Sequence, residues 1–347
     1  MLSLPIANDL YMALDSSSIF SVIGYGSWAT TLVGQLLGKG IRVNWLILNP
    51  EVSDCVVNEG YNPKYVPDLE LDKSLLDVSA DVNEVVSKGD IILLAAPSAY
   101  LKKSLEGLNC SLEGKFFLSA IKGIVPDECT TVLDFIRNRY GVRQECLGLV
   151  SGPTHAEEVS RGRLSFLTVA CLSEDDAALI ASRIGSESLR VSVSTDVRGI
   201  EFASILKNIY ALGAGIASGL GYGDNFLAVL AAASAGEMSS FLNRCFPYEG
   251  RDLSLCPYLG DLLVTCYSNY SRNRRLGVLI GRGCSVKSAL NEMTMIAEGY
   301  FSAECMHRLE EREGIAAQPI ANAVYRILYE GARPRKTFDY LARNILK

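Results

Sequence analysis

The stretch Ile19-Phe20-Ser21-Val22-Ile23-Gly24-Tyr25-Gly26-Ser27-Trp28-Ala29 decides the fold of this chain. Its apolar beginning is typical of a buried strand, and the residues of Trp28–Leu37 repeat apolar side chains at helical spacing. Between the two, Gly24, Gly26 and Ala29 fit the pattern G-x-G-x-x-G/A. Glycines at these places allow a close approach of the backbone, so that a pyrophosphate can rest on the free N–H groups of the helix. A dinucleotide loop is therefore favoured over a merely structural turn, because a further apolar run completes a strand, helix and strand unit.

The rest of the N-terminal half alternates short apolar runs with helical segments, which predicts a doubly wound parallel sheet. The expected strands after the first are Val43–Leu48, Ile91–Ala96, Phe116–Ile121, Leu147–Val150, Leu167–Cys171 and Leu189–Val193. The chain then changes to long helical segments, which are Ile200–Ala217, Phe226–Phe241, Leu253–Cys266, Arg274–Ile280, Ser285–Leu290, Phe301–Arg312 and Ile320–Tyr329. We therefore expect an α/β fold in which a Rossmann-type domain, residues 1–198, precedes an all-helical domain, residues 199–347, with a cleft between them.

Composition limits the classes of function. The 347 residues suffice for about two cores, and the net charge of −6 offers no general attraction to nucleic acid or an anionic membrane. Ten cysteines are scattered without a CxxC pair and only two histidines are present, so reduced, buried thiols are expected rather than a metal site. Met1–Ser18 lacks the design of a signal peptide, and no apolar run reaches the ~18 residues of a membrane span. We expect a cytoplasmic protein.

Ligands of open α/β sheets bind beyond the carboxyl ends of the strands. Pro97 and Lys122 stand at two such ends, and Ser151-Gly152-Pro153-Thr154 forms a donor-rich turn at a third. For Lys122, a cation at the crevice and a solvated lysine are equally good interpretations. The second strand ends at Asn49, where NAD enzymes often carry an acidic residue and NADP enzymes a nearby arginine. The pattern therefore leaves NAD and NADP both open, and Arg42, at the other end of that strand, should lie too far away to contribute.

One lysine stands out in the predicted helix Ile200–Ala217. Four apolar side chains share one face of this helix, which leaves small, nearly uncharged residues around Lys207 on the other. A solvent-exposed face would normally carry several charges, so this face is typical of a cleft wall with a single ammonium group. Desolvation lowers the pKa of a lysine, which suits proton transfer near neutral pH. The alternative, an amphipathic helix with one exposed lysine, fits the pattern less well.

Arginines cluster where another predicted helix begins, in Ser268-Asn269-Tyr270-Ser271-Arg272-Asn273-Arg274-Arg275. Cations at a helix start face the positive end of the helix dipole, so a bound anion is expected to offset them. A single phosphate fits an acidic protein better than a nucleic acid does, and a solvated basic turn is the alternative. Upstream, Asp261 and Thr265 lie four residues apart. Asp261 fits either a helix cap or a group that orients a nearby lysine and binds a substrate hydroxyl.

Taken together, these motifs resemble those of the bacterial-type soluble NAD(P)-dependent glycerol-3-phosphate dehydrogenases, in the same order and over nearly the whole chain. The matching stretches are Val22–Thr30, Lys122-Gly123, Ser151–Glu158, Leu206-Lys207-Asn208, Gly219–Gly223, Leu259–Leu262, Ser271–Arg275 and Glu298-Gly299-Tyr300. The resemblance implies a 6-phosphogluconate dehydrogenase-like arrangement of the two domains. The chain departs from the family at Tyr258, where glycine is usual, at Ala120-Ile121, where threonine is common, and in a longer N-terminus. None of these departures removes a charged group.

The resemblance also implies roles for individual residues. Lys207 would be the acid/base, and glycerol phosphate would be surrounded by Lys122, Gly152, Thr154, Asp261, Ser271, Arg272 and Asn273. The cofactor would contact Ser27, Trp28, Lys122, Ala156, Arg272, Ile296 and Glu298. To these sets we add Asn208 and Thr265 on the substrate side, and Gly24, Gly26, Asn49 and Pro97 on the cofactor side.

The expected reaction passes hydride from NAD(P)H to C2 of dihydroxyacetone phosphate, while Lys207 protonates the developing alkoxide. Lys122 and Asn208 would support the oxyanion, Asp261 and Thr265 would hold Lys207 or a substrate hydroxyl, and Arg272 with Asn273 would bind the phosphate. The product, sn-glycerol 3-phosphate, would supply the glycerophospholipid backbone. Two alternatives stay open: another β-hydroxyacid or ketopantoate-type reductase, and a non-catalytic dinucleotide-sensing module. A homodimer is expected on general grounds only.

Overall fold

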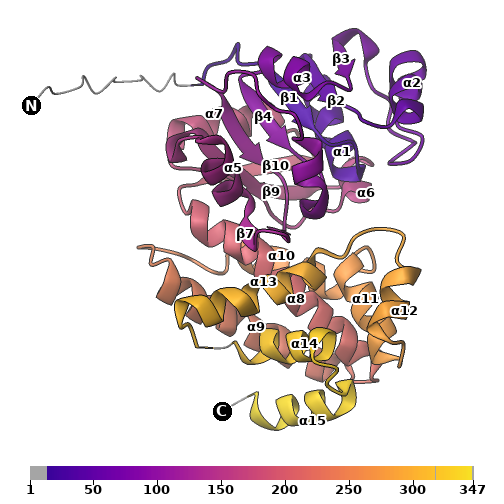
Figure 1. The fold of residues 1–347 in the computed structure, drawn as a ribbon, viewed down its shortest axis with the longest axis vertical. Coiled ribbons are helices and arrows are strands. Elements are labelled where there is room, and N and C mark those ends of the chain that lie inside the picture. The colour runs from indigo at the N-terminus through magenta and orange to yellow at the C-terminus, as the bar shows by residue number, and fades with distance from the viewer. Residues whose placement is uncertain (1–13, 317, 346–347) are drawn as a thin grey trace, which may run out of the picture.

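The computed structural model describes residues 14–316 and 318–345. A sheet domain, formed by the first part of the chain, packs directly on a helical domain formed by the rest (Figure 1). The prediction that Met1–Ser18 is not a signal peptide falls largely on residues 1–13, which lie outside the described residues.

The sheet has eight strands in the order β10-β9-β8-β5-β4-β1-β2-β3. Their bounds are β1 Phe20–Ile23, β2 Val43–Leu46, β3 Leu76–Ser79, β4 Ile91–Leu94, β5 Phe116–Ser119, β8 Leu147–Ser151, β9 Ser165–Cys171 and β10 Leu189–Ser194. All seven expected strands form. Strand β3 was not expected, because its residues Leu-Asp-Val-Ser form no apolar run and none of them is fully buried. The small hairpin of β6 (Ile124–Val125) and β7 (Thr130–Thr131) was not expected either.

One strand pair contradicts the expectation of an all-parallel sheet. Strands β8 and β9 pair antiparallel, with Leu149 opposite Ala170. A parallel partner needs a long crossover that covers one face of the sheet, usually with a helix. The only helix between these strands, α6 (Ala156–Val159), has four residues and leaves the chain to turn back beside β8.

The strands send alternate side chains to two cores, one on each side of the sheet. Phe20 and Val22 of β1 join the core that also contains residues of α1 and α7, whereas Ile23 joins the core on the opposite face. That second core continues without a break into the helical domain through Ile205 and Phe202. The helices of the sheet domain are α1 Ser27–Leu37, α2 Pro50–Glu59, α3 Val82–Lys88, α4 Leu101–Ser104, α5 Val132–Tyr140, α6 and α7 Glu174–Ile184.

Helix α8 (Val197–Gly219) is the central helix of the second domain. It was expected to expose one face to a cleft, and that expectation is wrong, since nearly every residue of the helix is buried. Later helices enclose it on all sides, and only Lys207 and Asn208 of this helix line the cavity described below. The enclosing helices are α9 Asp224–Cys245, α10 Asp261–Tyr267, α11 Arg272–Gly281, α13 Glu298–Glu313 and α14 Pro319–Tyr329.

The remaining helices differ in part from the expected ones. Helix α12 (Val286–Glu292) forms as expected, and α15 (Pro334–Asn344) was missed. The single helix expected over Leu253–Cys266 is instead a π-helical turn, Cys256–Gly260, followed by α10. Pro257, at the start of that turn, lacks the N–H that a continuous helix would need. Asp261 is therefore the first residue of α10 rather than its cap.

The backbones of α8 and α11 touch. A Cβ added to Gly215 of α8 would lie 2.1 Å from the carbonyl oxygen of Arg274, and one added to Gly277 of α11 would lie 2.2 Å from the carbonyl oxygen of Leu212. No side chain larger than hydrogen fits at either place. Helix α8 carries Lys207, and α11 begins at Arg272. The contact therefore fixes the position of these two residues relative to each other.

Two helices, α8 and α9, are long and apolar enough to cross a membrane. The most apolar window of α8 is entirely buried inside the protein, as in the core helix of a soluble domain, and 44% of the corresponding window of α9 is buried. Core helices pass the same test of length and composition, so neither helix establishes a membrane span.

Candidate functional site

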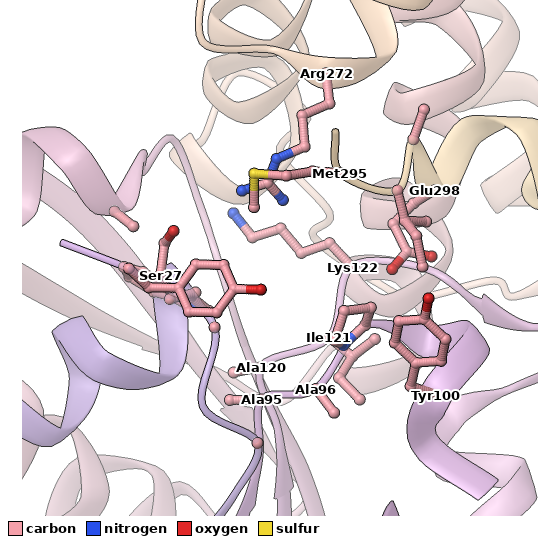
Figure 2. A pocket seen from close by; sticks show the side chains of 18 of the residues that line it. Ser27, Ala95, Ala96, Tyr100, Ala120, Ile121, Lys122, Arg272, Met295 and Glu298 are labelled. Carbon is pink, nitrogen blue, oxygen red and sulfur yellow. The ribbon is translucent and has the colours of Figure 1, made fainter. Parts of the chain in front are cut away.

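A cavity of about 1040 Å³ lies where the carboxyl ends of the strands meet the helical domain. The glycine loop before α1 and the ends of β2, β4 and β5 line it from the sheet side, and α8, α10, α11 and the start of α13 line it from the other. Figure 2 shows Lys122 of the sheet domain and Arg272 of the helical domain pointing toward one another in this cavity, with Ser27 to one side and Glu298 and Tyr100 to the other.

All but one of the site residues predicted from the sequence line this cavity. They are Gly24, Gly26, Ser27, Trp28, Asn49, Pro97, Lys122, Thr154, Ala156, Lys207, Asn208, Asp261, Thr265, Ser271, Arg272, Asn273, Ile296 and Glu298. The exception is Gly152, which does not line the cavity. Its N–H donates to Oδ2 of Asp261 at 3.3 Å, and its carbonyl accepts from Lys122 at 2.6 Å. Gly152 therefore holds Asp261 and Lys122 in position, because its backbone N–H and carbonyl bond to these two side chains.

The glycine loop offers a place for an anion. Gly24 has φ +113°, and a Cβ there would lie 2.6 Å from the backbone N of Ala96, so the loop can pass over β4 only with glycine at this position. Gly26 precedes α1 without a side-chain cap, which leaves the first N–H groups of the helix directed at the cavity. Beside them, the indole N–H of Trp28 is buried and has no hydrogen-bond partner within residues 14–316 and 318–345. These groups fit the pyrophosphate of a dinucleotide.

Three charged groups form the centre of the site. The ammonium of Lys207 contacts Oδ1 of Asp261, and that of Lys122 lies 3.2 Å from Oδ2 of the same carboxylate. Lys207 is 4% exposed and Asp261 is 1% exposed. Asp261 also accepts from the hydroxyl of Ser151 at 3.3 Å. The hydroxyl of Thr265 donates to the backbone carbonyl of Asp261 at 2.5 Å, and so holds the turn rather than Lys207.

Burial shifts the pKa of Lys207 strongly. Desolvation, together with the nearby ammonium of Lys122, lowers this pKa to about 7 against the opposing charge of Asp261. For Asp261, burial by itself raises the pKa, but Lys122 and Lys207 together outweigh it and hold the pKa below its usual value. Lys207 therefore has the two properties of a proton donor and acceptor near neutral pH, namely a matched pKa and a place in the cavity.

A chain of amides connects the two helices that carry the site. Asn208 donates to the carbonyl oxygens of Lys122 at 2.6 Å and Ser204 at 3.1 Å, and it accepts from Asn273 at 2.8 Å. The amide oxygen of Asn273 in turn accepts from the N–H of Gly299 at 2.8 Å. Both N–H groups of Asn208 are thus engaged with the protein. Its predicted support of an oxyanion is therefore indirect, through the position of Lys122.

Arg272 stands at the start of α11, next to the cap residue. The hydroxyl of Ser271 caps the helix by accepting from the N–H of Arg274 at 3.2 Å. Among the described residues, Arg272 has no hydrogen bond or ion pair. Burial lowers the pKa of Arg272 below its usual value, and the carboxylates of Glu157 and Glu298 oppose this shift only in part. A partly buried guanidinium at a helix start, without a bonded partner, is suited to bind an anion from the cavity.

Glu298, the first residue of α13, joins the two domains across the cavity. Its carboxylate accepts from the N–H of Ser98 at 2.9 Å and also contacts the hydroxyl of Ser98. A Cβ on Gly123 would lie 2.3 Å from the carboxylate of Glu298, so a larger residue there would displace that carboxylate. Burial raises the pKa of Glu298. Figure 2 shows Glu298 above Tyr100 at the edge of the cavity.

The sequence assigned no role to many residues that line the cavity, and four of these bear on ligand binding. His155 follows the predicted turn at Thr154, and its Nε2 is buried without a partner in the described part of the chain. Burial, followed by the charges of Lys207 and Lys122, lowers the pKa of His155 to about 4, so its imidazole is neutral. A histidine directly after the donor-rich turn was the available signal.

The other three of these residues line the same cavity. Leu48 and Tyr100 are large apolar side chains that are 40% and 55% exposed, and Lys103 lies beside them. The ammonium group of Lys103 has no ion pair or hydrogen bond within the parts of the chain that the structure covers. Asn49 accepts from the N–H of Val52 at 3.1 Å as the cap of α2, which leaves its amide N–H groups to donate. Arg42 does not line the cavity, as predicted.

Comparison with known proteins agrees with this geometry. The family model for the N-terminus of NAD-dependent glycerol-3-phosphate dehydrogenase matches residues 20–177, and the model for its C-terminus matches residues 196–339. A curated relative from Prosthecochloris aestuarii, named glycerol-3-phosphate dehydrogenase [NAD(P)+], is 33% identical over 314 residues, which cover 90% of this chain and 94% of the relative.

Solved structures agree with the family models. The crystal structure of glycerol-3-phosphate dehydrogenase from Coxiella burnetii has a TM-score of 0.84 at 26% identity and covers 94% of this chain and 98% of its own. A ketopantoate reductase from Ralstonia eutropha has a TM-score of 0.54 at 14% identity and covers 92% and 99%, which shows a shared fold alone. The chain therefore belongs to the NAD-dependent glycerol-3-phosphate dehydrogenase family.

Proposed function

We propose that Lys207 transfers the proton in the reversible reduction of dihydroxyacetone phosphate to sn-glycerol 3-phosphate. The reaction follows from family membership: the chain is an oxidoreductase that uses NAD or NADP. The nicotinamide cofactor, when bound, supplies or accepts the hydride. In the reducing direction, the ammonium of Lys207 donates a proton to the oxygen on C2 as negative charge develops there, and Asp261 holds the ammonium in place. Lys122 adds a second positive charge beside that oxygen.

The cofactor would lie from the glycine loop to α13. Its pyrophosphate would rest on the start of α1, where the N–H of Trp28 supplies one further donor. Leu48 and Tyr100 offer apolar surface for an adenine ring at the far end. Contacts are also proposed for Gly24, Gly26, Ser27, Asn49, Pro97, Lys122, Ala156, Arg272, Ile296 and Glu298.

The substrate phosphate would bind at the start of α11. Arg272 has no other bonded partner among the described residues, and Asn273 orients the adjoining amide chain. Thr154, Ser271 and neutral His155 would surround the glycerol part, with His155 using its unpartnered Nε2 for a substrate oxygen. Gly152, Asn208 and Thr265 would act by positioning charged groups, because their polar atoms already bond to the protein.

The buried cluster of Lys207, Asp261 and Lys122 carries the proposal, because a non-catalytic dinucleotide sensor has no use for a buried lysine with a pKa of about 7. The deciding test is the oxidation of reduced cofactor on addition of dihydroxyacetone phosphate, with ketopantoate as the competing substrate. Turnover with dihydroxyacetone phosphate and not with ketopantoate supports the proposal. Turnover with ketopantoate alone, or with neither, contradicts it.

Several broader properties complete the proposal. The product would supply the glycerophospholipid backbone, the protein would act in the cytoplasm, and two copies would form a homodimer, which is the commonest oligomer of soluble proteins. We also propose the domain division at residues 198 and 199, supported by the start of α8 at Val197. Light scattering of the purified protein tests the dimer, and expression of residues 1–198 alone tests the division.

A further inference from the structure

Two cysteines from different domains meet where the β6–β7 hairpin packs against α13. The Sγ atoms of Cys129 and Cys305 lie 2.6 Å apart, closer than two unbonded sulfur atoms normally approach. Both thiols also face the carbonyl oxygen of Pro126, at 3.5 Å and 3.8 Å. The two residues are 176 positions apart in the sequence, so only the packing of the two domains brings them together. Among the ten cysteines, all of which lie in the described residues, no other pair shows such a contact.

The elements that carry these cysteines adjoin residues that line the cavity, because β6 follows Lys122-Gly123 and α13 begins at Glu298. Cys129 lies in the turn between β6 and β7, directly after Lys122-Gly123, and it has φ +44°, which is unusual for a residue other than glycine. Cys305 lies on α13, seven residues after Glu298. Strand β6 contacts α13 and the helical turn that contains Ser98. Figure 1 shows β7 at the junction of the domains, beside α13.

We propose that Cys129 and Cys305 are a thiol oxidation site, which a small-molecule disulfide converts into a covalent bond between the two domains. The expectation of buried thiols holds for Cys305 but not for Cys129, which is partly exposed. Burial, together with the contact to Cys129, raises the pKa of the Cys305 thiol. Cys129 is therefore the thiol that meets an oxidant first, because it is the one that solvent reaches.

The chemistry needs one equivalent of a disulfide RSSR. Cys129, as its thiolate, attacks one sulfur of RSSR, which forms a mixed disulfide and releases RS⁻. Cys305 then gives up its proton and attacks Sγ of Cys129, which releases the second RS⁻. The two leaving thiolates take up the two protons, so that two protein thiols are oxidised and RSSR is reduced to two RSH. A dithiol in excess reverses both steps.

The bond would restrain the domains where the substrate is enclosed. It would tie the turn after Lys122 to the helix whose first residue, Glu298, already contacts Ser98. Movements that admit substrate and release product between two domains would be slowed, since a covalent bond now joins the domains. Unfolding would become harder, because the bond closes a loop of just over half of the chain.

The test uses the reduced full-length enzyme and oxidised glutathione as the probe. We expect the loss of two of the ten thiols and a cross-linked pair of tryptic peptides, residues 123–137 and 288–308, each of which contains one of the two cysteines. We also expect kcat to fall at least about threefold and the melting temperature to rise by about 5 °C, both reversed by dithiothreitol. Cys129→Ser and Cys305→Ala should keep the activity of the reduced enzyme and lose both effects.

A matched control is Cys110→Ser, since Cys110 is also partly exposed but has no cysteine beside it. This variant should respond as the unaltered enzyme does. Glutathione that stays attached to Cys129 without a cross-link would overturn the proposal, and so would a cross-link that leaves kcat and the melting temperature unchanged. If Cys305→Ala does not fold, the decision rests on Cys129→Ser, which alters a partly exposed residue. The peptide masses do not depend on the assigned reaction, so failure of the cross-link and failure of the proposed function are distinguishable.

Discussion

Replacement of Lys207 by methionine should remove the proton donor and leave the rest of the site intact. Methionine has a similar length, and Asp261 would keep its ion pair with Lys122 at 3.2 Å and its bonds to Ser151 and Gly152 at 3.3 Å each. No buried charge would therefore be left alone, and the fold should tolerate the change. Positioned acids and bases contribute about 10²–10⁴ to a rate, so kcat should fall by that factor, or about 3–5 kcal/mol in the barrier.

The pH dependence makes this prediction sharper. Reduction of dihydroxyacetone phosphate needs the ammonium form of Lys207, whose pKa is about 7, so this rate should fall as the pH rises through 7. Oxidation of glycerol 3-phosphate needs the neutral amine and should rise over the same range. In Lys207→Met both profiles should be flat in this region. Steady-state kinetics in both directions measure this, with a fluorescence titration of NADH as the control for cofactor binding. Near-normal turnover of the variant, or an unchanged pH profile, would refute the assignment.

Four further predictions concern the phosphate site, the cofactor and a buried carboxylate. Arg272→Ala should cost about 2–4 kcal/mol in kcat/KM with dihydroxyacetone phosphate and little with unphosphorylated dihydroxyacetone, whereas equal losses would place Arg272 outside the phosphate site. Steady-state kinetics should give kcat/KM values for NADH and NADPH within about a hundredfold, or ~2.7 kcal/mol, of each other. Lys103→Ala should reduce kcat/KM for NADPH about threefold to tenfold more than kcat/KM for NADH. The control variant is Lys102→Ala, because Lys102 is also exposed but pairs with acidic residues. Burial raises the pKa of Glu237 to about 7. The stability that its protonated carboxyl contributes below the unfolded pKa should therefore be lost as the pH rises through 7. Glu237→Gln should reduce that loss by up to about 3 kcal/mol, measured by chemical denaturation at pH 5 and pH 8. An equal loss in the variant would assign the pH dependence to other groups.

The features that could be predicted from the sequence are those that a few neighbouring residues determine. Gly24 must be glycine because of its own backbone angle and its approach to Ala96, and that demand is visible in a six-residue pattern. The position of Lys122 after the end of a strand is likewise determined by neighbouring residues. The resemblance to a known family then placed Asp261 and Arg272 near the substrate, although no periodicity of the chain itself connects them.

The features that could not be predicted depend on distant parts of the chain. Helix α8 reads as amphipathic, but α10, α11, α13 and α14, which follow later in the sequence, cover its second face. Strand β3 forms through its pairing with β2 rather than through its own apolar content. Lys103 gave no signal, because an exposed lysine on a short helix is common and only the folded structure places it at the cavity. Cys129 and Cys305 lie 176 residues apart, a separation at which no pattern of spacing is informative.

The touching backbones of α8 and α11 have a consequence for how this enzyme tolerates change. Where side chains separate two helices, a substitution or a rise in temperature is absorbed by alternative rotamers, and the helices shift by small steps. Between Gly215 and Arg274, and between Gly277 and Leu212, there are no rotamers to adjust. The distance between the backbones of Lys207 and Arg272 is therefore set by main-chain atoms and stays constant. Shifts elsewhere in the helical domain leave this distance unchanged, whereas a single methyl group at either glycine would force the helices apart and displace Lys207 and Arg272, the proposed proton donor and phosphate-binding residue, relative to each other.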